Sequence, residues 1–457
     1  MYLDKNHDFN KLLLFMFLVI NNTFFNTFFD NLIYIIQNTK FKIMHIVADV
    51  GGIPGKDCNG FCKYCYFRKV KEIKVFGCAH CLPNKIGCER CSKGVADAQS
   101  AFKSPFEVLN TVQTALMMNS GAGEIIADIS GGGDISCYPY LESLTAQLNQ
   151  FSIKSHLGYS CGKGISDSDI ANRLINNGVE EATFTVFSTD PELRTQWVKD
   201  KHPREALDAC KIFCENIKLT GASVIIPGVN DGDVLRQTCD DLESWGAKGF
   251  ILMRFANTFN EGLILGNEPI LKDHESQPVE EFAQLVKDLN SEYNFRITGT
   301  PLCDPETGGP FAIAKDENKI FLQFIKPVTG EATLITSKIA APYIQNIFNK
   351  LEVDSVNVVA VEKEIACLIT KEDLESLDLS EIKEAVILPG RSFVHQLDAE
   401  RILSADGVER IVGRGPDTLT VDGELSIDLT DENVIERELE DFNDLVDAIN
   451  FFGMRVL

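Results

Sequence analysis

The feature that most constrains the fold is a regular alternation of short apolar runs and longer amphipathic stretches. Six runs are apolar and often β-branched, as expected of parallel strands buried on both faces: residues 45–49, 124–129, 154–158, 182–187, 222–226 and 249–253. Stretches with helical periodicity separate them: residues 105–118, 140–150, 167–177, 191–197 with 204–216, and 233–245. Six strands in series, separated by these helical stretches, predict an α/β fold, a parallel (β/α)6 partial barrel.

The pattern changes at a turn-rich stretch, residues 304–310 (DPETGGP), which should end the barrel. Beyond it, two apolar runs at 320–325 and 332–336 flank a Pro- and Gly-containing turn, as in a β-hairpin. A helix is predicted at 342–351 and an acidic terminal helix at 432–450. We therefore predict two domains, the barrel over residues 44–303 and a smaller α+β domain over residues 304–457.

The first 43 residues do not fit this pattern. Their apolar run at 12–20 (LLLFMFLVI) is too short to span a bilayer, since a spanning helix needs about 20 residues. It is long enough for a signal-peptide core, but no clear small-residue cleavage site follows. We expect the protein to start at Met44, with residues 1–43 an extension outside the fold; a membrane anchor is the less favoured alternative.

The net charge and the cysteine content indicate which partners and which cellular compartment fit this protein. The formal net charge is −24, from 67 acidic and 43 basic residues, whereas nucleic-acid binding needs a dense basic face. Seven of the 14 cysteines fall between Cys58 and Cys91, and such local packing in an enzyme-sized chain indicates metal binding rather than disulfides. Because thiolate ligands persist under reducing conditions, we expect a cytoplasmic protein. Because the net charge is strongly negative, we expect no nucleic-acid partner.

Cys58, Cys62 and Cys65 form a C-x3-C-x2-C motif just after the first predicted strand, with Tyr64 before the last cysteine. A barrel places its chemistry in loops at the carboxyl ends of its strands. Three thiolates can hold three irons of a [4Fe–4S] cubane, which leaves the fourth iron open to a chelating amine and carboxylate. Taken alone, the motif also fits a zinc site. In this position it resembles the radical S-adenosylmethionine (SAM) superfamily, in which the cluster's electron breaks a C–S bond of SAM.

A glycine-rich turn after the second predicted strand strengthens this resemblance. It consists of Gly131, Gly132, Gly133 and Asp134. The turn resembles the superfamily motif that meets the methionine amine of SAM, although Glu is more usual than Asp at its last position. Glycines let the backbone approach closely, and a carboxylate accepts hydrogen bonds from an ammonium group.

A second turn follows the fifth predicted strand, in residues 224–231 (VIIPGVND). It resembles the superfamily motif that flanks adenine, and its candidate cofactor-binding residues are Pro227, Gly228 and Asn230. Either turn alone would also fit an ordinary tight turn. The order and spacing of the cysteine triad and the two turns favour the functional interpretation.

Four further cysteines follow the triad as C-x2-C-x6-C-x2-C: Cys78, Cys81, Cys88 and Cys91. Two such pairs can build a closed tetrahedral site for zinc or a single iron. The loop has few apolar residues, so we expect the metal to order it. A structural role is favoured, and electron relay is the alternative.

Tyr159 lies at the end of the third predicted strand, in the segment HLGYSCGKG. That position is near the expected cluster. It fits a packing tyrosine at the barrel rim and equally a phenolate that reaches the open iron when SAM is absent.

The whole set of motifs resembles the methanogenesis marker ten radical SAM proteins. The resemblance rests on DCNGFCKYCYFRKV, the four-cysteine loop, GGGD, LGYSCGKG, IIPGVND and TPLCDPETGGPFAI, and it extends from Met44 to the C-terminus. Members of this family, from anaerobic methanogenic archaea, are cobalamin-dependent methyltransferases. They methylate the δ-carbon of an arginine in the α subunit of methyl-coenzyme M reductase.

The resemblance implies cofactors and roles that spacing does not show. The four-cysteine loop would hold a single iron, Tyr159 would match a tyrosine able to ligate the cluster, and residues 304–457 would bind cobalamin without a protein histidine beneath cobalt. One SAM would methylate cobalamin. A second, reduced with electrons from a low-potential donor, would give the 5′-deoxyadenosyl radical that takes hydrogen from arginine. Because this carbon is unactivated, the cofactors would carry out the difficult steps.

Two other functions fit the same residues. One is a radical SAM peptide-modifying enzyme without cobalamin, in which the four-cysteine loop is an auxiliary electron-transfer centre. The other is a non-enzymatic metal or electron-transfer protein. Cobalamin uptake distinguishes the first from the favoured function, and formation of 5′-deoxyadenosine distinguishes the second.

Overall fold

The computed structural model describes residues 44–69, 101–118, 124–263, 269–308, 311–390, 392–416 and 431–454. Two predictions lie outside these residues. One is the extension at residues 1–43. The other is the metal loop that contains Cys78, Cys81, Cys88 and Cys91.

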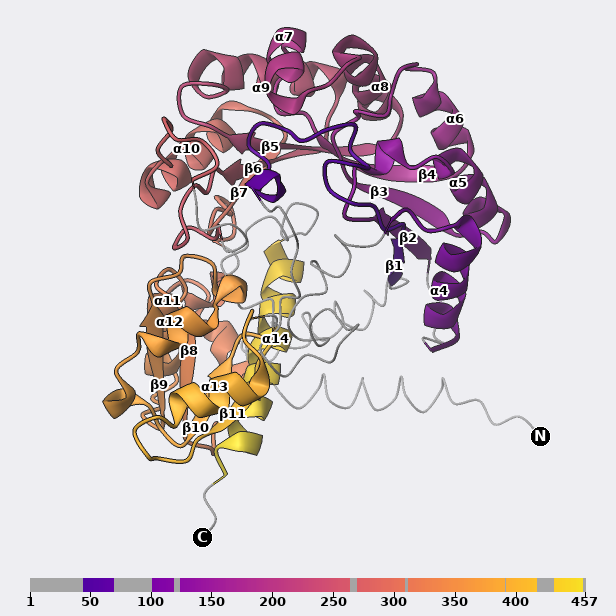
Figure 1. The fold of residues 1–457 in the computed structure, drawn as a ribbon. Helices are drawn as coiled ribbons and strands as arrows, with labels where there is room; N and C mark the ends of the chain where they lie inside the picture. Colours follow the sequence, from indigo (N-terminus) through magenta and orange to yellow (C-terminus); the bar gives the residue numbers. More distant parts are fainter. Residues whose placement is uncertain are drawn as a thin grey trace, which may run out of the picture.

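Seven parallel strands form one curved sheet whose spatial order is the order of the sequence (Figure 1). They are β1 Met44–Asp49, β2 Ile125–Ser130, β3 Lys154–Ser160, β4 Val179–Thr185, β5 Lys218–Ile225, β6 Gly249–Arg254 and β7 Arg296–Thr300. The connecting helices lie on the convex face: α4 Pro105–Met118, α5 Leu141–Gln150, α6 Ile170–Asn176, α7 Pro191–Leu193, α8 Pro203–Asn216, α9 Gly232–Trp245 and α10 Val279–Glu292. The predicted parallel partial barrel is confirmed, with a seventh strand added.

The alternation of side chains along the strands explains this arrangement. In β2, Ala127 and Ile129 are fully buried in the core between the sheet and the helices, whereas Asp128 between them faces the concave side. There the Asp128 carboxylate is 3.0 Å from Nδ1 of both His45 and His156. His156 in turn lies 3.0 Å from the hydroxyl of Thr183 in β4. A polar row therefore crosses four strands of the concave face, while the convex face forms the main core.

The second domain has its own sheet, with the strand order β11-β10-β8-β9. The strands are β8 Ala332–Ser337, β9 Val356–Val361, β10 Ala385–Leu388 and β11 Ile411–Arg414. Helices α11 Ala341–Lys350 and α14 Asp431–Phe452 cover one face, and α12 Lys371–Glu375 and α13 Gln396–Leu403 cover the other. A smaller second domain with the predicted helices near 342–351 and 432–450 is therefore present. Its described strands are all parallel, so in detail it is α/β rather than α+β.

The predicted hairpin at residues 320–336 is wrong. Lys319–Phe324 is a 3-10 helix in which only Leu322 is buried, and Ile320 and Phe324 are exposed. Strand β8, the other half of the expected hairpin, is buried at all six residues and pairs with β9 and β10 instead. Because β8 is buried at every residue, it has neighbours on both sides and cover on both faces, which an edge hairpin does not offer.

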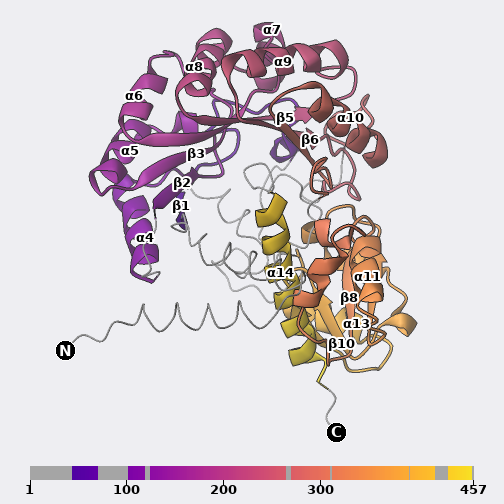
Figure 2. The same cartoon turned by 180° about the vertical axis from the view of Figure 1, so that it is seen from behind.

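The two domains meet at the carboxyl end of β6. Arg254 forms a buried ion pair with Glu364, which follows β9, with 2.8 Å between Nη2 and Oε2. The backbone of Glu364 donates to the carbonyl of Asn260 at 2.9 Å, and the fully buried Lys363 donates to the carbonyl of Phe259 at 2.7 Å. Figures 1 and 2 show α14 reaching from the second domain toward the concave side of the large sheet. The boundary at residue 303 stays a prediction, although Cys303 belongs to the barrel core and Phe311 to the core of the second domain.

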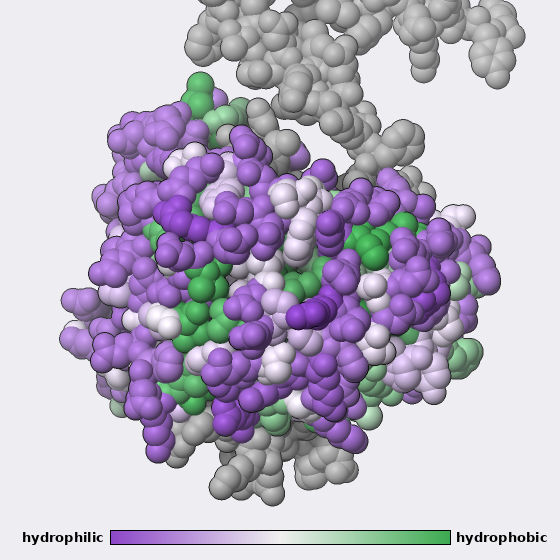
Figure 3. Space-filling model, turned by 90° about the horizontal axis from the view of Figure 1, so that it is seen from above, coloured by the Kyte–Doolittle hydropathy of each residue, from purple (hydrophilic) through white to green (hydrophobic). Residues whose placement is uncertain are grey.

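The outer face that carries the barrel helices is mainly hydrophilic, with separate small apolar patches (Figure 3). This agrees with the strongly acidic composition of the chain. Among the described residues, no helix is both long and apolar enough to cross a membrane.

Candidate active site

The loop after β1 is shaped by glycines and tight turns. Gly55 and Gly60 have φ values of +80° and +107°, a region that side chains with a Cβ rarely adopt. The N–H of Gly60 donates to the carbonyl of Gly55 at 2.8 Å, and the N–H of Asp57 donates to the carbonyl of Ile53 at 2.8 Å. The Asp57 carboxylate accepts from the N–H of Ile53 at 2.7 Å. The loop therefore folds back on itself and presents its cysteines from a compact turn.

Cys58, Cys62 and Cys65 are free thiols and half-buried. The N–H of Gly55 donates to Cys58 Sγ at 3.4 Å, and the Lys163 ammonium lies 3.9 Å from Cys62 Sγ. Burial, and then the charges of Cys62 and Cys58, raise the pKa of Cys65 to about 12.

Cys62 has the most polar surroundings of the three. A hydrogen bond from the thiol of Cys161, aided by the nearby Lys163, lowers the pKa of Cys62 to about 7 against the opposing effect of burial. Cys62 is therefore the cysteine of the triad that most readily becomes a thiolate, the form that binds metal.

No three His, Cys, Asp or Glu side chains of the described residues converge tightly enough to hold a single metal ion. A cubane binds each cysteine through a different iron, so its ligand sulfurs lie farther apart than those of one ion. Three free sulfurs in one half-buried loop fit that group, because soft thiolates favour iron–sulfur clusters.

The glycine-rich turn packs against the cysteine loop. A Cβ on Gly131 would lie 2.1 Å from the carbonyl oxygen of Gly51, and one on Gly133 would lie 3.0 Å from that of Asp57. Gly132 lies between them and is half-buried. Larger residues at Gly131 or Gly133 would push the turn and the cysteine loop apart, so these two glycines hold the loops in contact.

Asp134 is buried and joins three segments. Its Oδ1 accepts from the hydroxyl of Ser160 at 2.9 Å and from the N–H of Ser136 at 3.1 Å, and its Oδ2 accepts from the N–H of Lys163 at 3.0 Å. A carboxylate offers about four acceptor positions, so there is room for one further donor. The predicted contact with the cofactor amine stays a prediction, and the structure adds a supporting role.

The turn after β5 has an open tip and a buried anchor. Pro227 is half-buried, and Gly228, at φ +74°, is exposed with open space around it. Asn230 is 1 % exposed. Its Oδ1 accepts from the N–H of Ile226 at 2.8 Å, and its amide nitrogen donates to the carbonyls of Phe187 and Val224, both at 2.9 Å. Asn230 thus ties this turn to the end of β4, and its contact with the cofactor stays a prediction.

An aromatic group lies beside Cys62. Tyr64 stacks on Phe187 with ring centroids 5.0 Å apart, and Phe187 stacks on Trp197 at 6.3 Å. These rings belong to an apolar cluster that Cys62 and Cys161 also contact. Phe187 has φ +62°, and the Asn230 bond to its carbonyl helps to hold this unusual conformation.

Tyr159 is 43 % exposed on β3. The pairing of β3 with β4 shifts register between Leu157 and Ser160, so Tyr159 lies in a bulge near the carboxyl end of the strand. That end continues into Cys161 and Lys163, both beside Cys62. Its role as a cluster ligand stays a prediction.

Two buried charged residues were not singled out from the sequence. Arg194 is fully buried, forms an ion pair with Asp200 at 2.8 Å, and donates to the carbonyls of Cys161 and Thr185. It thereby anchors the loops after β3 and β4. Lys163 is the second. The sequence signal for it is its position between two glycines, in GKG, which indicates a tight loop with little space for side chains.

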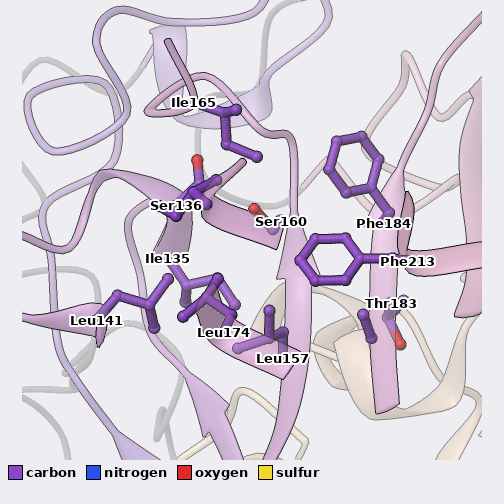
Figure 4. A pocket seen from close by; sticks show the side chains of 12 residues that line it. Ile135, Ser136, Leu141, Leu157, Ser160, Ile165, Leu174, Thr183, Phe184 and Phe213 are labelled. Atoms are coloured by element: carbon purple, nitrogen blue, oxygen red, sulfur yellow. The ribbon is translucent and has the colours of Figure 1, made fainter. Parts of the chain in front are cut away.

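A small cavity lies behind the glycine-rich turn, between the sheet and helices α5, α6 and α8 (Figure 4). Its walls are mainly apolar and include Leu157, Phe184 and Phe213, with Ser136 and Ser160 on the side of Asp134. At about 20 Å³ it has room for about one water molecule, so it is not a nucleotide site.

Residues 53–237 match the family model described as the radical SAM superfamily. This segment includes the cysteine triad, both predicted turns and Lys163. No curated protein matches the chain at a significant level.

Several solved structures are similar in part. A radical SAM methyltransferase from Sphaerobacter thermophilus shares 15 % identity, covers 46 % of this chain and 61 % of its own, with a TM-score of 0.31. SuiB from Streptococcus suis shares 12 %, covers 66 % and 62 %, with a TM-score of 0.39. Methylornithine synthase shares 9 %, covers 58 % and 72 %, with a TM-score of 0.33. The chain thus spans less than two thirds of the first two proteins, and these likenesses are too low to carry a functional argument. The family match therefore shows that residues 53–237 are similar to the radical SAM superfamily.

Proposed function

We propose that the protein is a cobalamin-dependent radical SAM methyltransferase that methylates the δ-carbon of a peptidyl arginine in the α subunit of methyl-coenzyme M reductase. Cys58, Cys62 and Cys65 would hold the [4Fe–4S] cluster, and the second domain would bind cobalamin. When bound, the cluster supplies the electron that cleaves SAM, and cobalamin supplies the methyl group. The proposal includes a low-potential electron donor that reduces the cluster, and a location in the reducing cytoplasm.

The observation that carries the radical SAM part is the position of the three free thiols. They lie on one glycine-shaped loop at the carboxyl end of β1, which packs against the glycine-rich turn after β2. Two parallel strands bring these loops to the same edge of the sheet. A ligand bound by both would therefore meet the sulfurs and the backbone N–H groups together.

The surrounding residues supply placement and exclusion of water. Gly131 and Gly133 let the backbone come close, Asp134 fixes the turn, and the exposed Gly228 leaves space where adenine is expected. The stacked rings of Tyr64 and Phe187 cover one side of Cys62. Such a site can hold reactants at fixed distances and keep water away. The arginine substrate and cobalamin rest on the resemblance of the motifs to the methanogenesis marker ten family.

The test uses anaerobically reconstituted protein. We expect a [4Fe–4S] spectrum, formation of 5′-deoxyadenosine with SAM and reductant, and stoichiometric uptake of cobalamin. A reductase peptide should gain one methyl group on an arginine carbon, as read by tandem mass spectrometry. Replacing Cys58, Cys62 and Cys65 by alanine should abolish the cluster. The matched control, Cys239→Ala, removes a buried cysteine from α9 on the convex side and should retain it.

The possible results test the radical SAM function and the use of cobalamin separately. A wild-type protein without the cluster, or a triple variant that keeps it, refutes the radical SAM function. A cluster with 5′-deoxyadenosine but no cobalamin uptake refutes only the cobalamin part and leaves the peptide-modifying enzyme with an auxiliary centre.

A further inference from the structure

The barrel buries a lysine next to the cysteine loop. Lys163 follows β3 and is 3 % exposed. Among the described residues its ammonium group forms no ion pair with a carboxylate; the nearby Asp134 accepts from the Lys163 backbone instead. A buried charge without a counter-charge is costly, and proteins normally pair it. Some anionic group is therefore expected at this position.

The fold directs this ammonium group to the cysteines. Lys163 Nζ donates to the carbonyl of Gly60 and lies 3.9 Å from Cys62 Sγ. Its backbone is held from two sides, since the carbonyl accepts from Asn59 Nδ2 at 3.1 Å and the N–H donates to Asp134. The side chain thus spans a short gap between two fixed loops and has little freedom to turn elsewhere.

The glycines on either side of Lys163 serve this placement. Gly162 has φ +73°, and a Cβ there would lie 2.5 Å from the ring of Phe184. A Cβ on Gly164 would lie 2.1 Å from the carbonyl oxygen of Ser136. Only a chain without side chains at both positions passes through this space. The two glycines therefore let the backbone of this loop take the path that brings Lys163 to Cys62.

We propose that the anionic partner of Lys163 is the iron–sulfur cluster held through Cys62, and that its positive charge stabilises the reduced cluster and so raises the reduction potential. This rests on the proposed function. Reduction adds one electron, supplied by the external low-potential donor, to a group already surrounded by thiolates. A cation beside one of those thiolates favours the more negative state, and charge and hydrogen bonds at cluster sulfurs set such potentials. Burial limits screening by water.

The simpler alternative is a structural tie, in which Lys163 only fastens the two loops through the Gly60 carbonyl. The two roles predict different potentials, so the test is a potentiometric titration of the reconstituted protein without SAM, followed by electron paramagnetic resonance. The variants are Lys163→Met and Lys163→Gln, which remove the charge, and Lys163→Arg, which keeps it. The matched control is Lys56→Met, which removes an exposed charge from the same cysteine loop.

We expect a lower midpoint potential for Lys163→Met and Lys163→Gln, little change for Lys163→Arg, and a smaller shift for Lys56→Met. If the neutral variants fail to hold iron while Lys163→Arg holds it, with circular dichroism unchanged throughout, the charge is needed for the cluster and the proposal stands. A neutral variant with the wild-type potential overturns it, and so does loss of iron in all three Lys163 variants. A wild-type protein that forms no cluster instead refutes the proposed function itself.

Discussion

Glu438 offers a quantitative test of how α14 is attached. Its carboxyl is 6 % exposed, and Oε2 accepts from the N–H of Ile313 at 3.0 Å. The other oxygen, Oε1, is buried without a hydrogen-bond partner among the described residues. Burial, and to a lesser extent the charges of Asp304 and Asp441, raise the pKa of Glu438 from the usual 4.5 to about 7, against the lowering effect of the N–H groups of Ala312 and Ile313. The folded protein therefore favours the protonated acid.

The sign and size follow from linkage. Because the folded pKa lies above the unfolded one, the stabilisation is complete below about pH 4.5 and is lost as the pH rises through 7. At about 1.4 kcal/mol for each pKa unit, the full loss is about 3 kcal/mol. About 2.5 kcal/mol of it falls between pH 5 and pH 8. Glu438→Gln removes the ionisation, so the stability of this variant relative to wild type should rise by that amount over the same range.

The assay is urea unfolding of both proteins at pH 5, 6, 7 and 8, followed by far-ultraviolet circular dichroism. Taking the difference between the two proteins cancels the other titrating groups. Glu440→Gln is the matched control, because it removes a carboxyl from an exposed position of the same helix, and its difference from wild type should not depend on pH. A Glu438→Gln difference that stays constant, or that falls as the pH rises, would show that the carboxyl is not held protonated.

Three further changes test other contacts. Arg194→Met leaves Asp200 buried without its partner and should cost about 3–5 kcal/mol of unfolding free energy in urea. Gly131→Ala places a methyl group 2.1 Å from the Gly51 carbonyl oxygen; it should cost about 1–3 kcal/mol and lower the iron bound after reconstitution, as measured by a colorimetric iron assay. Arg254→Leu removes the shorter ion pair of Glu364, whose pKa burial already raises, and leaves only the pair with Lys338 at 3.7 Å. It should loosen the contact between domains, seen as faster limited proteolysis in the segment after β6.

The fold was predictable where the chain carries long apolar runs. The first six strands have such runs and were found within a few residues of their bounds. Strand β7 was missed because its sequence, RITGT, has one strongly apolar residue, Ile297, and depends on β6 and α10 for its burial. The hairpin at 320–336 was wrong because adjacent apolar runs say nothing about whether strands pair with each other or with later strands. That choice is made by tertiary packing.

In the candidate site, too, residues close together in the sequence were easier to predict than residues brought together by the fold. Spacing along the chain could suggest the triad Cys58, Cys62 and Cys65 because all three belong to one loop, and their role as cluster ligands stays a prediction. Lys163 reaches that loop from 101 residues farther along, and no local pattern reports a contact of that kind. The sequence shows the two glycines that flank Lys163, but it does not show that they pack against Phe184 and Ser136.

Asp134 and Asn230 show why a motif can point to the right place and leave the role open. Both were predicted as cofactor-binding residues, and both are buried with most of their hydrogen-bonding capacity used inside the protein. A loop that must meet a ligand closely also needs a buried polar group to fix its backbone. A sequence motif that marks such a loop can therefore contain the fixing group as well as the ligand contact. The test is therefore selective: Asn230→Ala should weaken the hold on Phe187 and lower stability by about 1–3 kcal/mol even in protein without cofactor, whereas loss of a pure ligand contact would leave the cofactor-free protein unchanged.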